Sequence, residues 1–210
     1  MSGVSRDRRG AWLAGLFVFL LLASEAVLTL PDESASDVTV AEFYVSHRST
    51  IIVVQIVGLI AAALLAAFAV HLRPVDRIVA STGLLTALLA CAPGLATIVL
   101  AVVADTSNPA SAGVWNQRLP LADDLLFGGI VLFGLAVAIR LRSHRVLAVL
   151  GGLAAVLCLG RLLLETTGSG RGWFETLGPL AFVVLMGAFA VACWRGTLLT
   201  RTSSTHASGV

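Results

Sequence analysis

Apolar residues fall into six long runs along this chain. The links after the second and fourth runs are tight, and those after the first and third are longer and polar. The runs cover residues 11–30, 50–72, 78–104, 121–141, 146–164 and 174–194. A helix that crosses a bilayer needs about 20 mainly apolar residues, so each run is long enough to span a membrane. The pattern therefore predicts an all-α, polytopic membrane protein, a six-transmembrane-helix bundle. This bundle forms a single domain over residues 11–195, between an N-terminal segment at 1–10 and a tail at 196–210 that we expect to be disordered.

Composition agrees with a lipid environment for most of the chain. Hydrophobic residues make up 58% of the sequence and charged residues only 12%, whereas a soluble domain carries about 25% charged residues. All 14 basic residues are arginine, which excludes a lysine Schiff base and with it a retinal protein of the usual kind. Cys91, Cys158 and Cys193 lie inside apolar runs without metal-ligand spacing, so we interpret them as core residues. The sequence predicts no metal site, no cofactor and no nucleic-acid partner.

The arginines are distributed unevenly, and their distribution predicts the orientation of the chain. One set of helix ends carries Arg6, Arg8, Arg9, Arg73, Arg77, Arg140, Arg142, Arg145, Arg195 and Arg201, whereas the other carries only Arg48, Arg118 and Arg171. Loops rich in arginine stay in the cytoplasm, so we expect both termini to be cytoplasmic and the protein to lie in the plasma membrane. One alternative stays open, in which the first run is a signal peptide that is cleaved near Ala26.

Polar residues inside the predicted spans lie at similar depths. With a rise of about 1.5 Å per residue, Glu25 and Arg161 lie roughly 20 Å from the inner face, and Gln55 lies about 8 Å below the outer face. All three fall in the outer third of a hydrocarbon core that is about 30 Å thick. Charges inside a membrane are costly, and they are normally paired or functional. The shared depth predicts an outward-facing ligand-binding layer made of Glu25, Gln55, Asp123, Asp124, Arg161 and Glu165.

The fourth span opens with two adjacent carboxylates in the stretch RLPLADDLLFGG. Adjacent residues of a helix point in different directions, so only one of the two can face a narrow interior. Asp124 shares its helix face with small Gly128, and small residues favour close helix packing. We therefore expect Asp124 to point inward, where Arg161 has Glu25, Asp124 and Glu165 as candidate partners. Asp123 is expected to cap or complement the start of the helix.

Structural explanations for the same residues are equally open. The aspartate pair sits directly after Pro120, which favours a plain helix start. Arg161 and Glu165 are four residues apart on one helix, so they can neutralise each other. Gln55 alone is typical of a hydrogen bond between membrane helices. Pro93–Gly94 and Gly178–Pro179 are each expected to kink a span.

Four short stretches carry a resemblance to a known group of proteins. They are FYVSHRST before the second run, AVHLR after it, LAVVADTSNP at the end of the third, and LADDLLF at the start of the fourth. Through these stretches the chain over residues 40–190 resembles actinobacterial multi-pass membrane proteins that are assigned to domains of unknown function. The resemblance implies a six-helix bundle in the plasma membrane, and it implies neither an activity nor catalytic residues.

These observations favour a non-enzymatic membrane protein that binds a small polar molecule or a lipid headgroup in its outer polar layer. One alternative is a transporter, since six helices with an outer binding layer resemble the substrate-capturing subunits of energy-coupling vitamin transporters. Another is an intramembrane enzyme, a cyclase or lipid-modifying enzyme, with Glu25 or Asp124 as its buried acid. A homo-oligomer or a complex with a partner membrane protein is a further alternative, in which the polar layer only clamps helices together.

Overall fold

Six of the helices in the structure are long and apolar enough to cross a membrane. The structure is a computed structural model that describes residues 2–31, 34–166 and 172–198. The six candidate spans are Arg8–Val27, Arg48–His71, Arg77–Val103, Pro109–Arg140, Arg145–Leu164 and Thr176–Trp194. No strand occurs in these ranges. The predicted all-α architecture with six spans is confirmed, and the chain is a multi-pass helical membrane protein.

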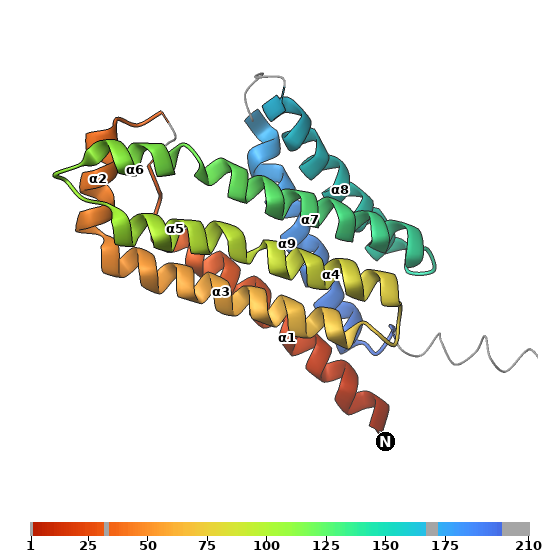
Figure 1. Cartoon of the computed structure of the whole chain (residues 1–210). Coiled ribbons are helices and arrows are strands. Elements are labelled where there is room, and N and C mark those ends of the chain that lie inside the picture. Colours follow the sequence, from red (N-terminus) through yellow and green to blue (C-terminus); the bar gives the residue numbers. More distant parts are fainter. Residues whose placement is uncertain (1, 32–33, 167–171, 199–210) are drawn as a thin grey trace, which may run out of the picture.

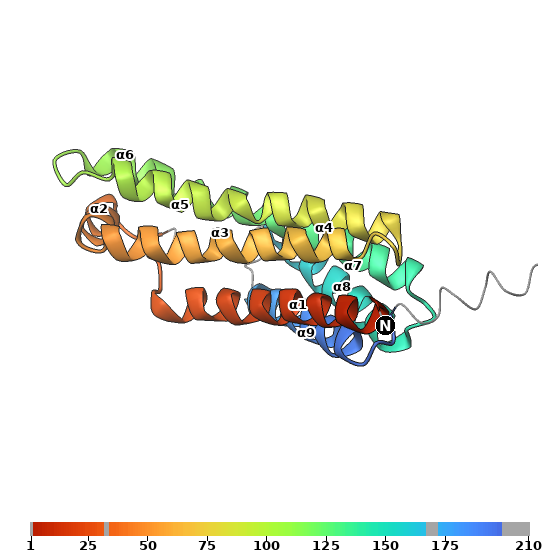
Figure 2. The ribbon, with the colours of Figure 1, turned by 90° about the horizontal axis from the view of Figure 1, so that it is seen from below.

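The described residues form nine helices, because one predicted span is divided into α4 and α5, and two links form the short helices α2 and α6 (Figure 1). The helices are α1 (Ser2–Val27), α2 (Asp37–Ser46), α3 (Arg48–His71), α4 (Arg77–Leu89), α5 (Cys91–Val103), α6 (Pro109–Asn116), α7 (Leu119–Arg140), α8 (Arg145–Thr166) and α9 (Gly172–Trp194). Helix α7 packs against α4 and α8, and α9 packs against α8 and α1. Helix α1 also packs against α3. Figure 2 shows α1 and α9 together on the side of the bundle that faces away from α4 and α5.

The third predicted span is interrupted at Ala90, which separates α4 from α5. Pro93 has no amide hydrogen, and its ring clashes with the carbonyl four residues earlier, at Leu89. The interruption therefore falls just before the proline, in agreement with the kink expected at Pro93–Gly94. In contrast, α9 is one helix across Pro179.

Two links that the sequence analysis treated only as polar segments form helices α2 and α6. Helix α2 begins after Ser36, whose hydroxyl accepts a hydrogen bond from the Thr39 amide at 3.3 Å. Helices α2 and α6 pack against each other. They are part of a second apolar cluster, which contains Val40, Ala41, Tyr44, Ile51, Leu100, Ala101, Ala104 and Ala112. Each helix is too short to produce a clear periodic pattern in the sequence, and this explains why they were missed.

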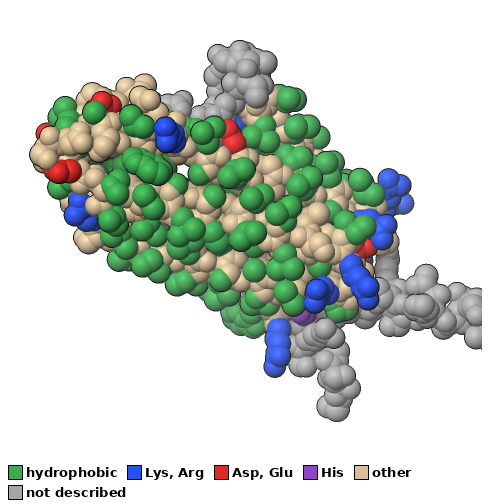
Figure 3. All heavy atoms as spheres, in the orientation of Figure 1, with side chains coloured by type: hydrophobic (Ala, Val, Ile, Leu, Met, Phe, Trp, Pro, Cys, Tyr) green, Lys and Arg blue, Asp and Glu red, His purple; other side chains and the backbone are tan. Residues whose placement is uncertain are grey.

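Charged side chains separate between the two ends of the bundle (Figure 3). We call one end, with Arg77, Arg140, Arg142, Arg145 and Arg195, the arginine-rich end, and the other, with Asp37, Glu42 and Asp105 around α2 and α6, the acidic end. The N-terminal end of α1 and the C-terminal end of α9 both lie at the arginine-rich end (Figure 1). The arginine-rich end is the one that the sequence predicts to be cytoplasmic, and this orientation stays a prediction.

Helical structure and core packing extend close to both ends of the described residues. The N-terminal segment belongs to α1, which begins at Ser2 and buries Ala14 and Phe17 in the main core. At the other end of the chain, Leu198 is 2% exposed and also packs in this main core, the larger apolar cluster that includes Phe68, Phe133 and Phe189. The ordered packing thus extends past residue 196, and the rest of the expected tail, 199–210, lies outside the described residues.

At the arginine-rich end, Asp76 lies just before α4 and connects the start of this helix with the end of α7. Its carboxylate accepts hydrogen bonds from the amides of Ile78 and Val79 and so caps the N-terminus of α4. The Nε atom of Arg140 also donates to it at 2.9 Å. Partial burial raises the pKa of the Asp76 carboxyl, but the Val79 amide, the Arg140 guanidinium and the Ile78 amide outweigh it and lower the pKa.

Acidification is expected to weaken this cap. Because the pKa is lowered in the folded state, the stabilisation is complete above the unfolded pKa, near 3.8, and is lost as pH falls through the folded value. Asp76→Ala should lower the free energy of unfolding by about 1 kcal/mol near neutral pH. Asp76→Asn keeps a capping side chain and should lose less. Unfolding titrations near pH 7 and below pH 4 check this, and an equal pH dependence in wild type and Asp76→Asn would contradict it.

Candidate functional site

The bundle contains one arginine that is almost completely buried among the described residues. Arg161 lies on α8 and is 2% exposed, and it is the largest of the fully buried side chains. It is 16 residues beyond Arg145, so it lies roughly 24 Å along the helix from the arginine-rich end. A guanidinium at this depth needs a counter-charge, because an unpaired charge inside a membrane is very costly.

Asp124 supplies this counter-charge from the neighbouring helix α7. The Nη1 atom of Arg161 donates a hydrogen bond to Oδ1 of Asp124 at 2.9 Å. The Asp124 side chain is 25% exposed, so it is the accessible member of an otherwise buried pair. Of the three candidate partners that the sequence left open for Arg161, the structure shows Asp124 in an ion pair with it.

The guanidinium also lies over the ring of Phe127. The distance from Cζ of Arg161 to the ring centroid is 3.8 Å. Phe127 follows Asp124 by three residues on α7, so both side chains project from one face of that helix. A desolvated cation over an aromatic ring gains about 2 kcal/mol. Asp124 and Phe127 thus hold the arginine from a single helix.

Helix α9 closes the site from another side. A Cβ atom at Gly178 would lie 3.2 Å from Sγ of Cys158 and 3.4 Å from the Phe127 ring, so only a glycine fits there without displacing a neighbour. Cys158 is completely buried one turn before Arg161 on α8. The surroundings of the guanidinium are therefore apolar, and in such a setting electrostatic interactions are stronger than in water.

One donor of Arg161 has no acceptor in the part of the chain that the structure describes. This donor is the Nε–H group, which is buried and makes no hydrogen bond there. A guanidinium carries five N–H donors and no acceptor. Any group that binds it must therefore offer acceptor oxygens or negative charge.

The structure corrects the argument by which Asp124 was placed inside the bundle. Gly128 has open space where a Cβ would be, and Leu135 is 44% exposed. The face of α7 that packs inward instead contains Phe127, Ile130, Phe133, Gly134 and Val137. Asp124 reaches Arg161 from the edge of this face. Small size alone did not indicate the inward face, because α7 buries Phe127, Ile130 and Phe133 together with Gly134 and leaves Gly128 open.

Asp123 does not cap the helix, so the capping alternative was wrong, and its electrostatic complement to the helix start stays a prediction. Helix α7 begins at Leu119 after the N-cap residue Arg118, so Asp123 is already in its second turn. Pro120 occupies the first turn, where its missing amide hydrogen has no effect. Asp123 is half-buried next to Asp124, and no salt bridge to Arg161 is seen for it.

The other predicted site residues are placed elsewhere or are not described. Gln55 on α3 faces α5, since a Cβ at Gly94 would lie 3.3 Å from its Oε1 atom. Glu25 is exposed on α1, which packs against α3 and α9, whereas α8 packs against α7 and α9. Of the carboxylates described, only Asp124 is in salt-bridge distance of Arg161. The side chain of Glu165 lies outside the described residues.

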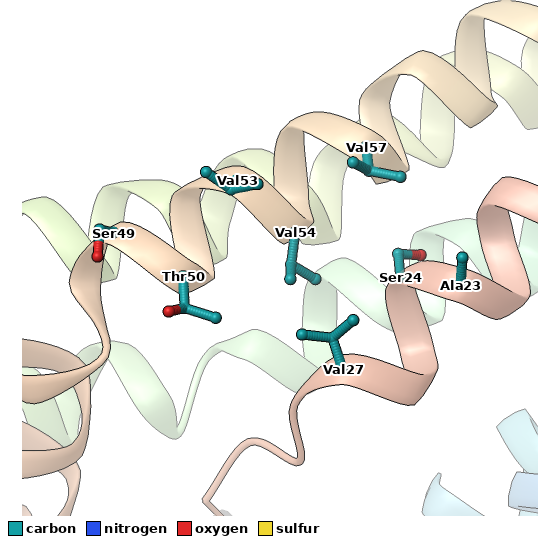
Figure 4. A pocket seen from close by; sticks show the side chains of 8 residues that line it. All are labelled: Ala23, Ser24, Val27, Ser49, Thr50, Val53, Val54 and Val57. Atoms are coloured by element: carbon teal, nitrogen blue, oxygen red, sulfur yellow. The ribbon is translucent and has the colours of Figure 1, made fainter.

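A shallow groove lies near Glu25, between the end of α1 and the start of α3 (Figure 4). Its volume is about 410 Å³, and its lining residues are Ala23, Ser24, Val27, Ser49, Thr50, Val53, Val54 and Val57. The hydroxyl of Ser24 is already engaged, since it donates to the Leu21 carbonyl at 2.8 Å. The groove therefore has valine walls and a few hydroxyl groups, and it contains no charged lining residue.

Comparison of the chain with protein-family models, with curated proteins and with solved structures finds no match. Within the described ranges there is also no group of three histidine, cysteine, aspartate or glutamate side chains that could hold a metal ion. The class that the fold defines is the multi-pass α-helical membrane protein. The most distinctive chemical feature of this chain is the buried Arg161–Asp124 pair.

Proposed function

We propose that this membrane protein binds an anionic small molecule or lipid headgroup, through a carboxylate or phosphate group, at Arg161. The observation that carries the proposal is a 2% exposed guanidinium whose described counter-charge is a partly exposed carboxylate. The ligand reaches the site from the side of the acidic end, where α7 begins. This function refines the outward-facing polar layer that the sequence predicts, with Arg161 as its anchor.

Arginine suits this task better than other cations. Its planar fork of donors matches carboxylate and phosphate groups, which it binds through two parallel hydrogen bonds. The Phe127 ring packs against one face of the guanidinium, and the hydrogen bond to Asp124 occupies one Nη atom. The Nε–H group supplies a further donor for an incoming oxygen atom.

In this proposal, Asp124 is a counter-ion that the ligand displaces. It keeps the guanidinium neutralised when no ligand is bound, since an isolated buried charge would destabilise the bundle. Its exposed fraction of 25% gives it a route to rotate away from Arg161. A ligand that brings its own negative charge replaces this interaction without leaving the arginine unpaired.

Native mass spectrometry of the protein in nanodiscs, formed directly from the producing cell membrane, tests the proposal. We expect a bound anionic species on wild type and a loss of at least tenfold in occupancy for Arg161→Gln. Asp124→Asn removes the competing charge, so it should bind the species at least as well as wild type. The matched control is Arg140→Gln, which breaks the Asp76–Arg140 pair at the arginine-rich end and should leave occupancy unchanged.

Two additions distinguish the source of the ligand. Nanodiscs refilled with phosphatidylglycerol test a lipid headgroup, and titration with inorganic phosphate in zwitterionic nanodiscs tests a free anion. Equal occupancy in wild type and Arg161→Gln in every arm would refute the proposal. The Arg161–Asp124 pair would then act as a clamp between α7 and α8, a role that their extensive packing also favours.

A further inference from the structure

A second groove lies at the arginine-rich end, between the start of α1 and the end of α9. Its volume is about 450 Å³, and it is lined by Ala11, Trp12, Gly15, Leu16, Phe19, Ala190, Val191 and Trp194. All of these lining residues are apolar or glycine. The groove shares no lining residue with the groove of Figure 4, and it contains neither Arg161 nor Asp124.

The groove extends from the membrane interface toward the bilayer interior. Trp12 and Trp194 are 69% and 60% exposed, and tryptophans of this kind concentrate at the headgroup level. Phe19 is seven residues beyond Trp12, so the groove reaches roughly 10 Å deeper. Nothing lies within 4 Å of a Cβ built on Gly15, so the middle of the groove is open. An extended hydrocarbon chain fits this shape.

One arginine side chain packs on a tryptophan at the mouth of the groove, and two more arginines are adjacent in sequence. The guanidinium of Arg8 on α1 lies over the Trp194 ring of α9, 5.8 Å from the centroid. Arg9 and Arg195, the neighbours of these two residues in sequence, are both exposed. In the sequence, the segment RDRR at residues 6–9 has a net charge of +2, so this end of the chain is cationic.

We propose that this groove binds an anionic phospholipid of the leaflet at the arginine-rich end. One acyl chain lies between α1 and α9, against Gly15 and Phe19, and the phosphate group contacts Arg8 and Arg195. The apolar walls of the groove match an acyl chain, and the arginines at its mouth complement the negative charge of the headgroup. Basic clusters of this kind attract anionic lipids. This inference does not depend on the function proposed for Arg161.

A second copy of the chain matches the groove less well than a lipid does. A two-fold dimer brings the same patch of both subunits together. The Arg8 and Arg195 side chains of the two copies would then face each other at the mouth. Repulsion between like charges disfavours such an interface, whereas a phosphate group is attracted to it.

Tryptophan fluorescence offers a direct test, because two of the four tryptophans line the groove. In a Trp115→Phe, Trp173→Phe background, emission comes only from Trp12 and Trp194. Nanodiscs contain equal fractions of phosphatidylglycerol and phosphatidylcholine, with brominated acyl chains on one lipid or on the other. We expect brominated phosphatidylglycerol to quench at least twice as strongly as brominated phosphatidylcholine.

Two variants distinguish lipid binding in the groove from a general attraction between the arginines and anionic lipids. Arg8→Gln combined with Arg195→Gln should equalise quenching by the two lipids, and Arg118→Gln at the other end should not. Gly15→Leu leaves every arginine in place but fills the groove, and it should also abolish the preference. Circular dichroism verifies that each variant is folded. Equal quenching by both lipids in the background protein, or a preference that survives Gly15→Leu, would overturn the proposal.

Discussion

Replacing Asp124 with leucine is expected to lower the free energy of unfolding by about 3 kcal/mol, the low end of the range for breaking a buried ion pair. The loss arises because Arg161 stays buried at 2% exposure without its counter-charge. The low end applies because the Asp124 side chain is 25% exposed and part of its charge is already solvated. The effect should exceed that of any surface substitution in the bundle.

A second substitution should restore most of this loss. In Asp124→Leu, Arg161→Met no buried charge remains, and apolar side chains of similar size replace buried ion pairs at little cost. Unfolding in mixed micelles, with circular dichroism as the readout, gives the free energies of wild type, both single variants and the double variant. These four values form a double-mutant cycle, which isolates the coupling between the two residues.

The matched control for this cycle is Asp123→Leu. It removes the adjacent carboxylate and leaves the Arg161–Asp124 pair intact. We expect it to change the free energy of unfolding by less than about 1 kcal/mol, as substitutions away from buried charges usually do. A double variant as unstable as Asp124→Leu alone would contradict the charge-based explanation, since the loss would then come from packing.

The second large effect is expected where α7 crosses α8. A Cβ atom at Gly134 would lie 2.5 Å from the carbonyl oxygen of Gly151, and one at Gly151 would lie 2.8 Å from the carbonyl oxygen of Gly134. These obstacles are backbone atoms that cannot rotate away. Gly134→Ala and Gly151→Ala should therefore force the helices apart and lower the free energy of unfolding by about 2 kcal/mol each.

Neighbouring glycines of the same helices provide the controls. A Cβ at Gly128 meets nothing within 4 Å, and one at Gly152 meets only the Ala138 Cβ at 3.8 Å. Because alanine is the better helix former by about 1 kcal/mol, Gly128→Ala and Gly152→Ala should be neutral or stabilising. The same unfolding titration in micelles measures all four variants. If all four changes were equally tolerated, the close crossing of α7 and α8 would be excluded.

The depth of polar residues was predictable, but their lateral positions were not. Counting residues along a span estimates how far a side chain lies from the membrane surface, and it placed Glu25, Gln55 and Arg161 in one layer. Counting does not reveal which helices are neighbours. The structure puts α8 beside α7 and α9, and it puts Glu25 and Gln55 on α1 and α3. Similar depth therefore did not bring Glu25 or Gln55 into salt-bridge or hydrogen-bond contact with Arg161.

Phe127 shows what sequence reasoning missed in the site itself. The sequence pattern did not single it out, yet the centroid of its ring lies 3.8 Å from Cζ of Arg161. A signal was available, since an aromatic residue three positions after Asp124 projects from nearly the same side of the helix. What could not be known is that α8 passes this side of α7 with Arg161 at the matching height.

The sequence by itself determined the six membrane-spanning helices and the separation of charge between their ends. Each span depends on an uninterrupted run of apolar residues, which the bilayer selects by length and polarity without reference to other helices. The packing order, the α2–α6 pair, the close glycine crossing and the Arg161 site were decided only by the tertiary structure. Lipid is as apolar as the helix surfaces, so hydrophobicity cannot choose neighbours inside a membrane. Shape complementarity and paired polar groups make that choice, and both depend on contacts between residues that are distant in the sequence.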